Sequence, residues 1–129
     1  MSNISLSLNE IYELAKKTFS HNGCDDETSK IMADLVMKAE RDGSLSHGLF
    51  RVPAYISGLK SGKINGKGKP NIKTITPSIV KADGNNCLAP VVLKKVFLNL
   101  LSLPRKMELL SWQLQILITW LLCGLKQKQ

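Results

Sequence analysis

Apolar side chains recur every three or four residues near the start of the chain, which is the period of a helix with one buried face. They follow Ser7 and Glu10, whose spacing matches a capping box, and Gly23 supplies a candidate helix end. The apolar positions are Leu8, Ile11, Tyr12, Ala15 and Phe19. The pattern predicts an amphipathic first helix over residues 8–21.

A second apolar stripe follows directly. Asp25 and Asp26 are candidate N-caps, Glu27 suits the positive end of a helix dipole, and the pattern continues to about Arg41. The apolar positions here are Ile31, Met32, Leu35, Val36 and Ala39. We therefore expect a second amphipathic helix that could pack against the first.

A third periodic stretch extends from His47 to Leu59, with Ser46 as its candidate cap and Gly62 as its end. Pro53 lies inside this stretch. Because proline removes one backbone donor, the predicted third helix should be kinked there.

The pattern changes after the third stretch. Residues 62–70 are rich in Gly and Lys and indicate an exposed loop, since they lack the spacing of a phosphate-binding loop. Residues 72–75 and 78–82 alternate like short strands on either side of Pro77, and Gly84 belongs to a turn. Three helices followed by short strands predict an α+β or α/β fold.

The composition changes again after Lys95, where 34 residues contain eleven Leu and a single acidic residue, Glu108. Residues 109–125 are nearly apolar and predict a Leu-rich C-terminal helix. Read as a membrane anchor, this segment is marginal, because it is short and carries Gln113 and Gln115 in its middle. A small basic membrane-associated protein is therefore one alternative.

Charge and cysteine content bear on three further questions: a nucleic-acid partner, a metal site and the cellular compartment. The formal net charge of +8 is dispersed, which is typical of a solvated surface and argues against a nucleic-acid partner. Cys24, Cys87 and Cys123 are far apart, without metal-ligand spacing, which favours a reducing compartment and no metal. The first residues lack a secretory pattern. At 129 residues, the chain is expected to be a cytoplasmic domain or a piece of one.

The candidate chemistry lies at the start of the third predicted helix. His47, Arg51 and Tyr55 are four residues apart, so a continuous helix would place an imidazole, a guanidinium and a phenol on one face. Arg can bind a carboxylate through two hydrogen bonds, Tyr can add a hydroxyl contact, and His can transfer a proton near neutral pH. Ser46 would add a hydroxyl at the helix N-terminus, where negative charge is favoured. These groups suit one small anion.

A structural interpretation of the same residues competes with the catalytic one. His47 could be an ordinary surface residue beside a serine. Arg51 could pair with Glu40 or Asp42, and Tyr55 could pack only against the apolar side of its own helix.

The segment ADLVMKAERDGSLSHGLFRVPAYISGLKSGKIN, residues 33–65, resembles the signature of the malate/L-lactate dehydrogenase family, with weaker similarity over about residues 4–95. That family also includes ureidoglycolate, sulfolactate and imino-acid oxidoreductases, and its fold is not a Rossmann fold. The resemblance implies that His47 donates a proton and that Arg51 binds the substrate carboxylate. Ser46 and Tyr55 would line the same pocket. The implied reaction is hydride transfer between NAD or NADP and a 2-oxo, imino or 2-hydroxy acid, in an enzyme that forms homodimers.

The same resemblance indicates what this chain lacks. The family's cofactor domain and a second histidine, in an N-S-x-H segment, have no counterpart here, so we expect no activity from this chain alone. We therefore divide it into a substrate-side segment, residues 1–95, and a non-family tail, residues 96–129. Read in the neighbouring frame with permitted codons, residues 95–124 can encode an N-S-Y-H segment. A frameshift near Lys95 would explain the tail.

Overall fold

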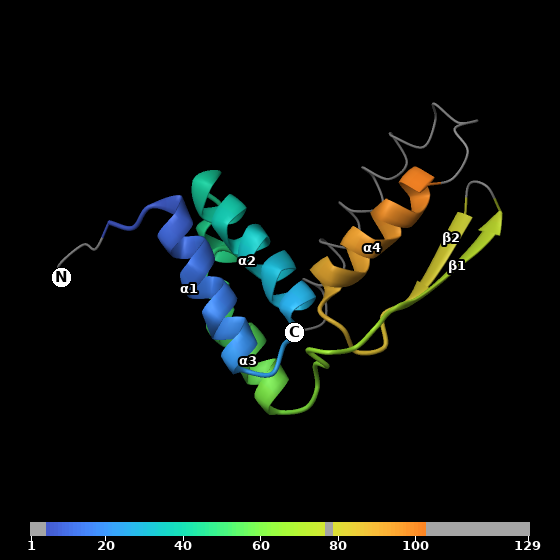
Figure 1. Cartoon of the computed structure of the whole chain (residues 1–129), viewed down its shortest axis with the longest axis horizontal. Helices are drawn as coiled ribbons and strands as arrows, with labels where there is room; N and C mark the ends of the chain where they lie inside the picture. Colours follow the sequence, from blue (N-terminus) through green and yellow to red (C-terminus); the bar gives the residue numbers. More distant parts are fainter. Residues whose placement is uncertain (1–4, 77–78, 103–129) are drawn as a thin grey trace.

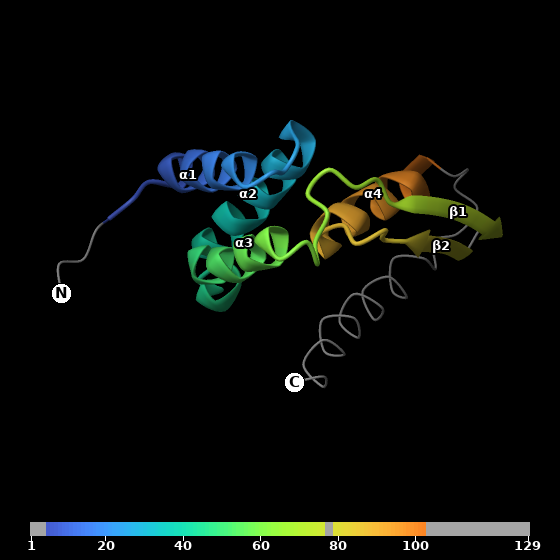
Figure 2. The same ribbon diagram turned by 90° about the horizontal axis from the view of Figure 1, so that it is seen from below.

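The first three helices lie together at one end of the molecule, and a β hairpin lies with the fourth helix at the other end (Figures 1 and 2). The computed structural model describes residues 5–76 and 79–102. In chain order the elements are α1 (Leu8–His21), α2 (Asp26–Arg41), the 3-10 turns η1 (Leu45–His47) and η2 (Leu49–Arg51), α3 (Val52–Lys60), β1 (Asn71–Thr76), β2 (Ile79–Asp83) and α4 (Ala89–Ser102). The described part of the chain is thus an α+β arrangement.

The first two helices begin and end close to where the sequence predicts. Ser7 and Glu10 form the capping box: the Ser7 N–H donates to Glu10 Oε2 over 2.8 Å, and the Glu10 N–H donates to Ser7 Oγ over 3.3 Å. Asp25 caps α2, because its Oδ1 accepts the Thr28 N–H over 2.7 Å. Both predicted helices are confirmed.

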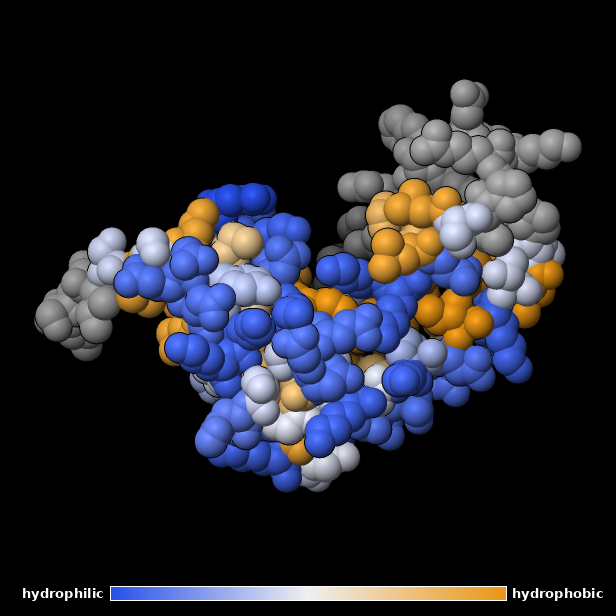
Figure 3. Space-filling view, in the orientation of Figure 1, coloured by the Kyte–Doolittle hydropathy of each residue, from blue (hydrophilic) through white to orange (hydrophobic). Residues whose placement is uncertain are grey.

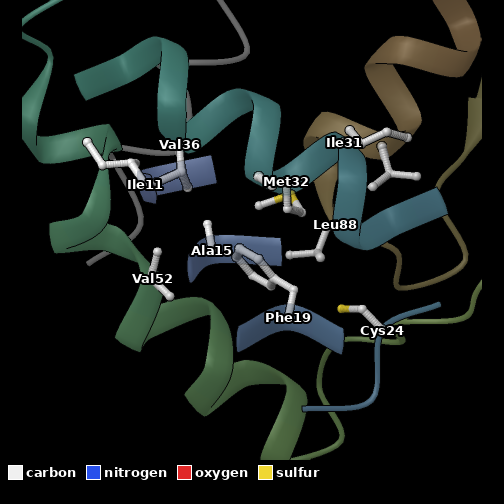
Figure 4. Packing of buried hydrophobic residues seen from close by; sticks show 11 residues of the cluster. Ile11, Ala15, Phe19, Cys24, Ile31, Met32, Val36, Val52 and Leu88 are labelled. Atoms are coloured by element: carbon white, nitrogen blue, oxygen red, sulfur yellow. The ribbon is translucent and has the colours of Figure 1, made fainter. Parts of the chain in front are cut away.

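The core lies where α1 packs against α2. Phe19, Met32 and Val36 are fully buried there, and Val52 of α3 and Leu88 before α4 close its sides (Figure 4). Apart from Leu88, these residues come from the apolar faces of the three helices. The core therefore holds the helical end of the molecule together and positions the segment between α2 and α3.

The third predicted helix is only partly correct. Gly48, with ψ of −141°, interrupts the helical backbone, so residues 45–51 form two short 3-10 turns and α3 begins only at Val52. Ser46 lies inside η1 and caps no helix, which corrects the predicted cap. Pro53 lies in the first turn of α3, where its missing N–H has no intrahelical partner to lose, so the predicted kink is absent.

The two predicted strands form an antiparallel hairpin, with Asn71 opposite Asp83 and Thr74 opposite Val80. Thr74 Oγ1 donates to Asn99 Oδ1 of α4 over 3.3 Å, which joins the hairpin to the last helix. Most of both strands is exposed.

No pattern in the sequence predicted α4. This helix spans residues on both sides of Lys95, and its first turn is anchored in the core by Val91. The predicted Leu-rich helix at residues 109–125 lies outside the described residues, and so does the proposed membrane anchor. Within residues 5–76 and 79–102, every helix is too short or too polar to cross a membrane.

Candidate active site

The candidate site follows the C-terminal end of α2. After Arg41 the chain reverses at Gly43, whose φ of +70° is one that glycine adopts at little cost. The Ser44 N–H then donates to Ala39 O over 2.8 Å, which folds the chain back over the last turn of the helix. The site residues that follow are therefore carried on a short connection tied to α2.

The two turns η1 and η2 present the predicted chemical groups in succession. The Gly48 N–H donates to Leu45 O over 3.2 Å and the Arg51 N–H donates to Gly48 O over 3.0 Å, so each turn is closed by its own hydrogen bond. Gly48 between them is buried, whereas His47 and Arg51 are exposed. The predicted single helical face for these two residues is therefore replaced by two adjacent turns.

The imidazole of His47 lies next to two hydroxyl groups. Its Nδ1 is 3.0 Å from Ser46 Oγ and 3.4 Å from Ser44 Oγ. An unprotonated Nδ1 can accept a hydrogen bond from either hydroxyl, and a protonated Nδ1 can donate a hydrogen bond to one of them. Both arrangements leave Nε2 available for a ligand. The side chain is exposed and lies outside the apolar core.

Arg51 does not form either of the ion pairs that the structural interpretation required. Asp42 instead binds Arg41, with Nε–Oδ1 and Nη2–Oδ2 distances of 2.7 and 3.1 Å. These hydrogen bonds lower the pKa of the Asp42 carboxyl. Glu40 accepts a backbone N–H from Leu49. Among the residues that the structure describes, the Arg51 guanidinium has no hydrogen-bonding partner, so it is available to an anion.

Tyr55 belongs to the packing of the helices. Its ring is half-buried and lies 6.2 Å from the ring of Phe19, with an interplanar angle of 51°. This contact assigns the ring to the edge of the core. The predicted contact of the Tyr55 hydroxyl with substrate remains a prediction.

Two residues of this site were missed by the sequence analysis in these roles. Glu40 Oε1 accepts the Leu49 N–H over 2.7 Å, and Gly48 lies directly against the same carboxylate. Glu40 had been considered only as a possible partner of Arg51. A carboxylate eight residues before a glycine is no recognised motif, so the sequence offered no signal for the contact.

The space beside two glycines of the Gly- and Lys-rich loop, residues 62–70, is occupied by other parts of the protein. A Cβ at Gly66 would lie 2.9 Å from Gly23 O and 3.0 Å from Cys24 Sγ, and a Cβ at Gly68 would lie 2.7 Å from Cys87 Sγ. These buried glycines make room for neighbouring thiols and backbone, so the loop does not fit a phosphate cradle. Burial, with a smaller effect of the adjacent Asp25 carboxylate, raises the pKa of the Cys24 thiol to about 11.

Comparison with known proteins shows the family of this chain. Residues 6–108 match the model of the malate/L-lactate dehydrogenase family. The chain belongs to this family. The match includes the whole candidate site and continues through α4, past the position near Lys95 where the sequence had suggested that the similarity ends.

Two relatives illustrate the similarity in sequence. The chain is 34% identical over 85 residues to the Delta(1)-pyrroline-2-carboxylate/Delta(1)-piperideine-2-carboxylate reductase of Pseudomonas syringae pv. tomato, which covers 66% of this chain and 25% of the relative. It is 36% identical over 90 residues to the malate/(S)-sulfolactate dehydrogenase of Methanothermus fervidus, covering 70% and 26%. The chain therefore spans about a quarter of the length of the curated relatives it matches.

Solved structures show the same fold for this part. The delta1-piperideine-2-carboxylate reductase of P. syringae superposes with a TM-score of 0.74 and 31% identity, over 80% of this chain and 31% of that one. The sulfolactate dehydrogenase of Methanocaldococcus jannaschii gives a TM-score of 0.64 and 36% identity, over 71% and 27%.

Proposed function

We propose that this chain is the substrate-side part of a NAD- or NADP-dependent oxidoreductase that acts on a small acid with a carboxylate next to a carbonyl, imine or hydroxyl-bearing carbon. One observation carries the proposal: His47 and Arg51 are both exposed on adjacent turns, and Arg51 has no competing partner among the described residues. The substrates for which the relatives are named support this class, because pyrroline-2-carboxylate, malate and sulfolactate all contain this arrangement.

Arg51 and His47 have different tasks in this proposal. The planar guanidinium of Arg51 binds the substrate carboxylate through two parallel hydrogen bonds. His47, as an imidazolium, donates its Nε2 proton to the oxygen or nitrogen on the adjacent carbon, while its Nδ1–H can donate to Ser46 Oγ. A bound nicotinamide would supply hydride to that carbon. The proton from His47 then balances the negative charge left on the heteroatom.

The nicotinamide itself is not assigned to residues of this chain. The loop at Gly66 and Gly68 is the part richest in glycine, and it is packed against Cys24 and Cys87. We assign cofactor binding to the part of the relatives that this chain does not match, which is about three quarters of their length. We therefore expect no oxidation of NADH or NADPH when the purified chain is given pyruvate or oxaloacetate.

Ligand binding tests the site directly. In 15N- and 13C-labelled full-length protein, millimolar pyruvate should shift the signals of His47 and Arg51, whereas propionate, which lacks the oxygen on C2, should shift mainly Arg51. Arg51→Ala should abolish both responses. Arg41→Ala is the matched control, because it removes an exposed arginine that is already paired with Asp42 and should leave the responses intact. Equal pyruvate responses in wild type and Arg51→Ala would refute the proposal.

The division at Lys95 also stays a proposal. We infer that residues 96–129 are an out-of-frame tail on a substrate-side segment, residues 1–95, because a neighbouring reading frame can encode family-like sequence. The family match itself extends 13 residues past this boundary, to residue 108. The encoding DNA tests this inference. An adjacent frame that meets a stop codon soon after Lys95 would refute it.

A further inference from the structure

The backbone N–H of Leu49, at the start of η2, has an unusual hydrogen-bond acceptor. In a continuous helix this N–H would donate to Leu45 O. At Gly48 the backbone leaves the helical conformation, and Leu45 O instead accepts the Gly48 N–H. The Leu49 N–H donates to Glu40 Oε1, nine residues earlier, over 2.7 Å. A side chain from the last turn of α2 thus satisfies a donor that the break would leave unpaired.

Gly48 provides the space for this carboxylate. A Cβ on Gly48 would overlap Oε1 and Cδ of Glu40. Gly48 has no Cβ, so it leaves this space to the carboxylate. Gly48 is buried and Glu40 half-buried, so solvent competes little for the bond. The Glu40 carboxylate can therefore reach the Leu49 N–H only because residue 48 has no side chain.

The neighbouring carboxylates of α2 are engaged elsewhere. Asp42 is bound by Arg41 over 2.7 Å, and Asp34 by Lys38 over 2.8 Å, both on the outer surface. Glu40 is the carboxylate of this helix end that contacts the connection carrying the site, and a charged acceptor makes a stronger bond to N–H than a neutral one.

We propose that Glu40 is a positioning residue for the site: its carboxylate fastens the junction between η1 and η2 to α2 and so fixes the spacing of His47 and Arg51. This inference rests on the proposed function, because the two residues must meet one ligand. Glu40 itself touches no substrate. Its effect passes through the Leu49 amide and Gly48.

Amide exchange and ligand binding together test the proposal in the full-length chain. In Glu40→Ala, the Leu49 amide should exchange with solvent ~10-fold faster or more, as expected for the loss of one charge-assisted bond. The dissociation constant for pyruvate should rise ~5-fold or more, because the two anchors are no longer held at one spacing. Asp34→Ala is the matched control: it removes a carboxylate from the same helix and should change neither quantity.

A double-mutant cycle identifies the contact. Gly48→Ala should displace the Glu40 carboxylate and reproduce both effects, whereas Glu40→Ala/Gly48→Ala should be no worse than either single variant. Glu40→Gln keeps a carbonyl acceptor of the same shape and should restore most of the wild-type behaviour. If Glu40→Ala does not fold, Gly48→Ala, which displaces the same carboxylate, tests the contact in its place.

The outcomes separate this inference from the proposed function. If wild type shows no pyruvate response, the proposed function fails. If wild type responds and Glu40→Ala responds with the same dissociation constant and the same Leu49 exchange, the positioning role is wrong. Additive effects of Glu40→Ala and Gly48→Ala would also overturn it, because the two residues would then act independently.

Discussion

The helical region, residues 8–60, and the hairpin region, residues 71–102, differ in how they treat their large apolar side chains. In the first, the apolar faces of α1, α2 and α3 pack into a shared core with Phe19 fully buried, whereas Leu45 and Phe50, in the turns before α3, are 63% and 80% exposed. In the second, five large apolar side chains are at least half exposed: Ile75, Ile79, Phe97, Leu98 and Leu101. Figure 3 shows hydrophobic surface, in orange, at that end of the molecule. The stability of the described part therefore depends on the helical region, which also carries the candidate site.

The largest predicted effect compares one aromatic residue from each region. Phe19→Ala removes a fully buried ring and should reduce the free energy of unfolding by about 3–5 kcal/mol. Phe97→Ala removes a ring that is 50% exposed and should cost less than ~1 kcal/mol. Urea denaturation followed by far-ultraviolet circular dichroism measures both. Equal losses would show that the Phe97 ring is as well packed as the Phe19 ring and would remove the contrast.

The next effect concerns the start of α2. Asp25→Ala removes an N-cap and should cost about 1 kcal/mol at pH 7. The hydrogen bond from the Thr28 N–H is the main cause of the lowered pKa of Asp25. Because the folded-state pKa lies below the unfolded value of about 3.9, this stabilisation is present at higher pH and is lost as pH falls through the folded-state pKa. The difference between wild type and Asp25→Ala should therefore shrink below about pH 4.

Asp25→Asn separates the cap from its charge. Asparagine is an equally good N-cap, so this variant should stay within a few tenths of a kcal/mol of wild type at pH 7. It should also lack this contribution to the pH dependence. A constant difference between wild type and Asp25→Ala from pH 7 to pH 3 would contradict the assignment.

A smaller effect of opposite sign is expected inside the helical core. Ser29 is fully buried, and its Oγ has no hydrogen-bonding partner among the described residues. Ser29→Ala removes this polar atom and improves helix propensity, so the free energy of unfolding should rise by about 0.5–1 kcal/mol. Ser57→Ala, at an exposed position of α3, is the control for propensity alone. A loss of stability in Ser29→Ala would contradict this interpretation.

The smallest effect on stability is expected at the outer face of α4. Leu98 and Leu101 are 56% and 58% exposed, so replacing both with Ser should change the free energy of unfolding by less than ~0.5 kcal/mol while it reduces self-association. Light scattering and thermal unfolding measure the two quantities. Leu35→Ser, at a half-buried position packed on the core, should instead destabilise the protein.

The sequence predicted the elements whose signals are local. The bounds of α1 and α2 follow from an apolar stripe of helical period and from caps at Ser7 and Asp25. The strands were predicted within one or two residues at their ends, since alternation is also a local pattern. In contrast, α4 is apolar on more than one side and shows no clear stripe, although Pro90 in its first turn is a typical start signal.

The sequence proposed the residues of the candidate site but did not predict the backbone that carries them. His47, Ser46 and Arg51 lie together after α2, as expected, but not on one helix. The break depends on Gly48 and on a contact with Glu40 in the preceding helix, and an interaction between two elements has no periodic signature. Resemblance to the family, confirmed by the match over residues 6–108, suggests chemical roles for these residues, and those roles remain predictions.

The buried thiol of Cys24, between α1 and α2, can be used to detect separation of these two helices. Only thiolate reacts with alkylating agents, and with a pKa of about 11 on the order of one Cys24 thiol in ten thousand is ionised at pH 7. The folded packing also covers the sulfur. Alkylation of Cys24 should therefore follow the fraction of molecules in which the two helices have separated, so mass spectrometry of labelled peptides would report this separation without an engineered probe.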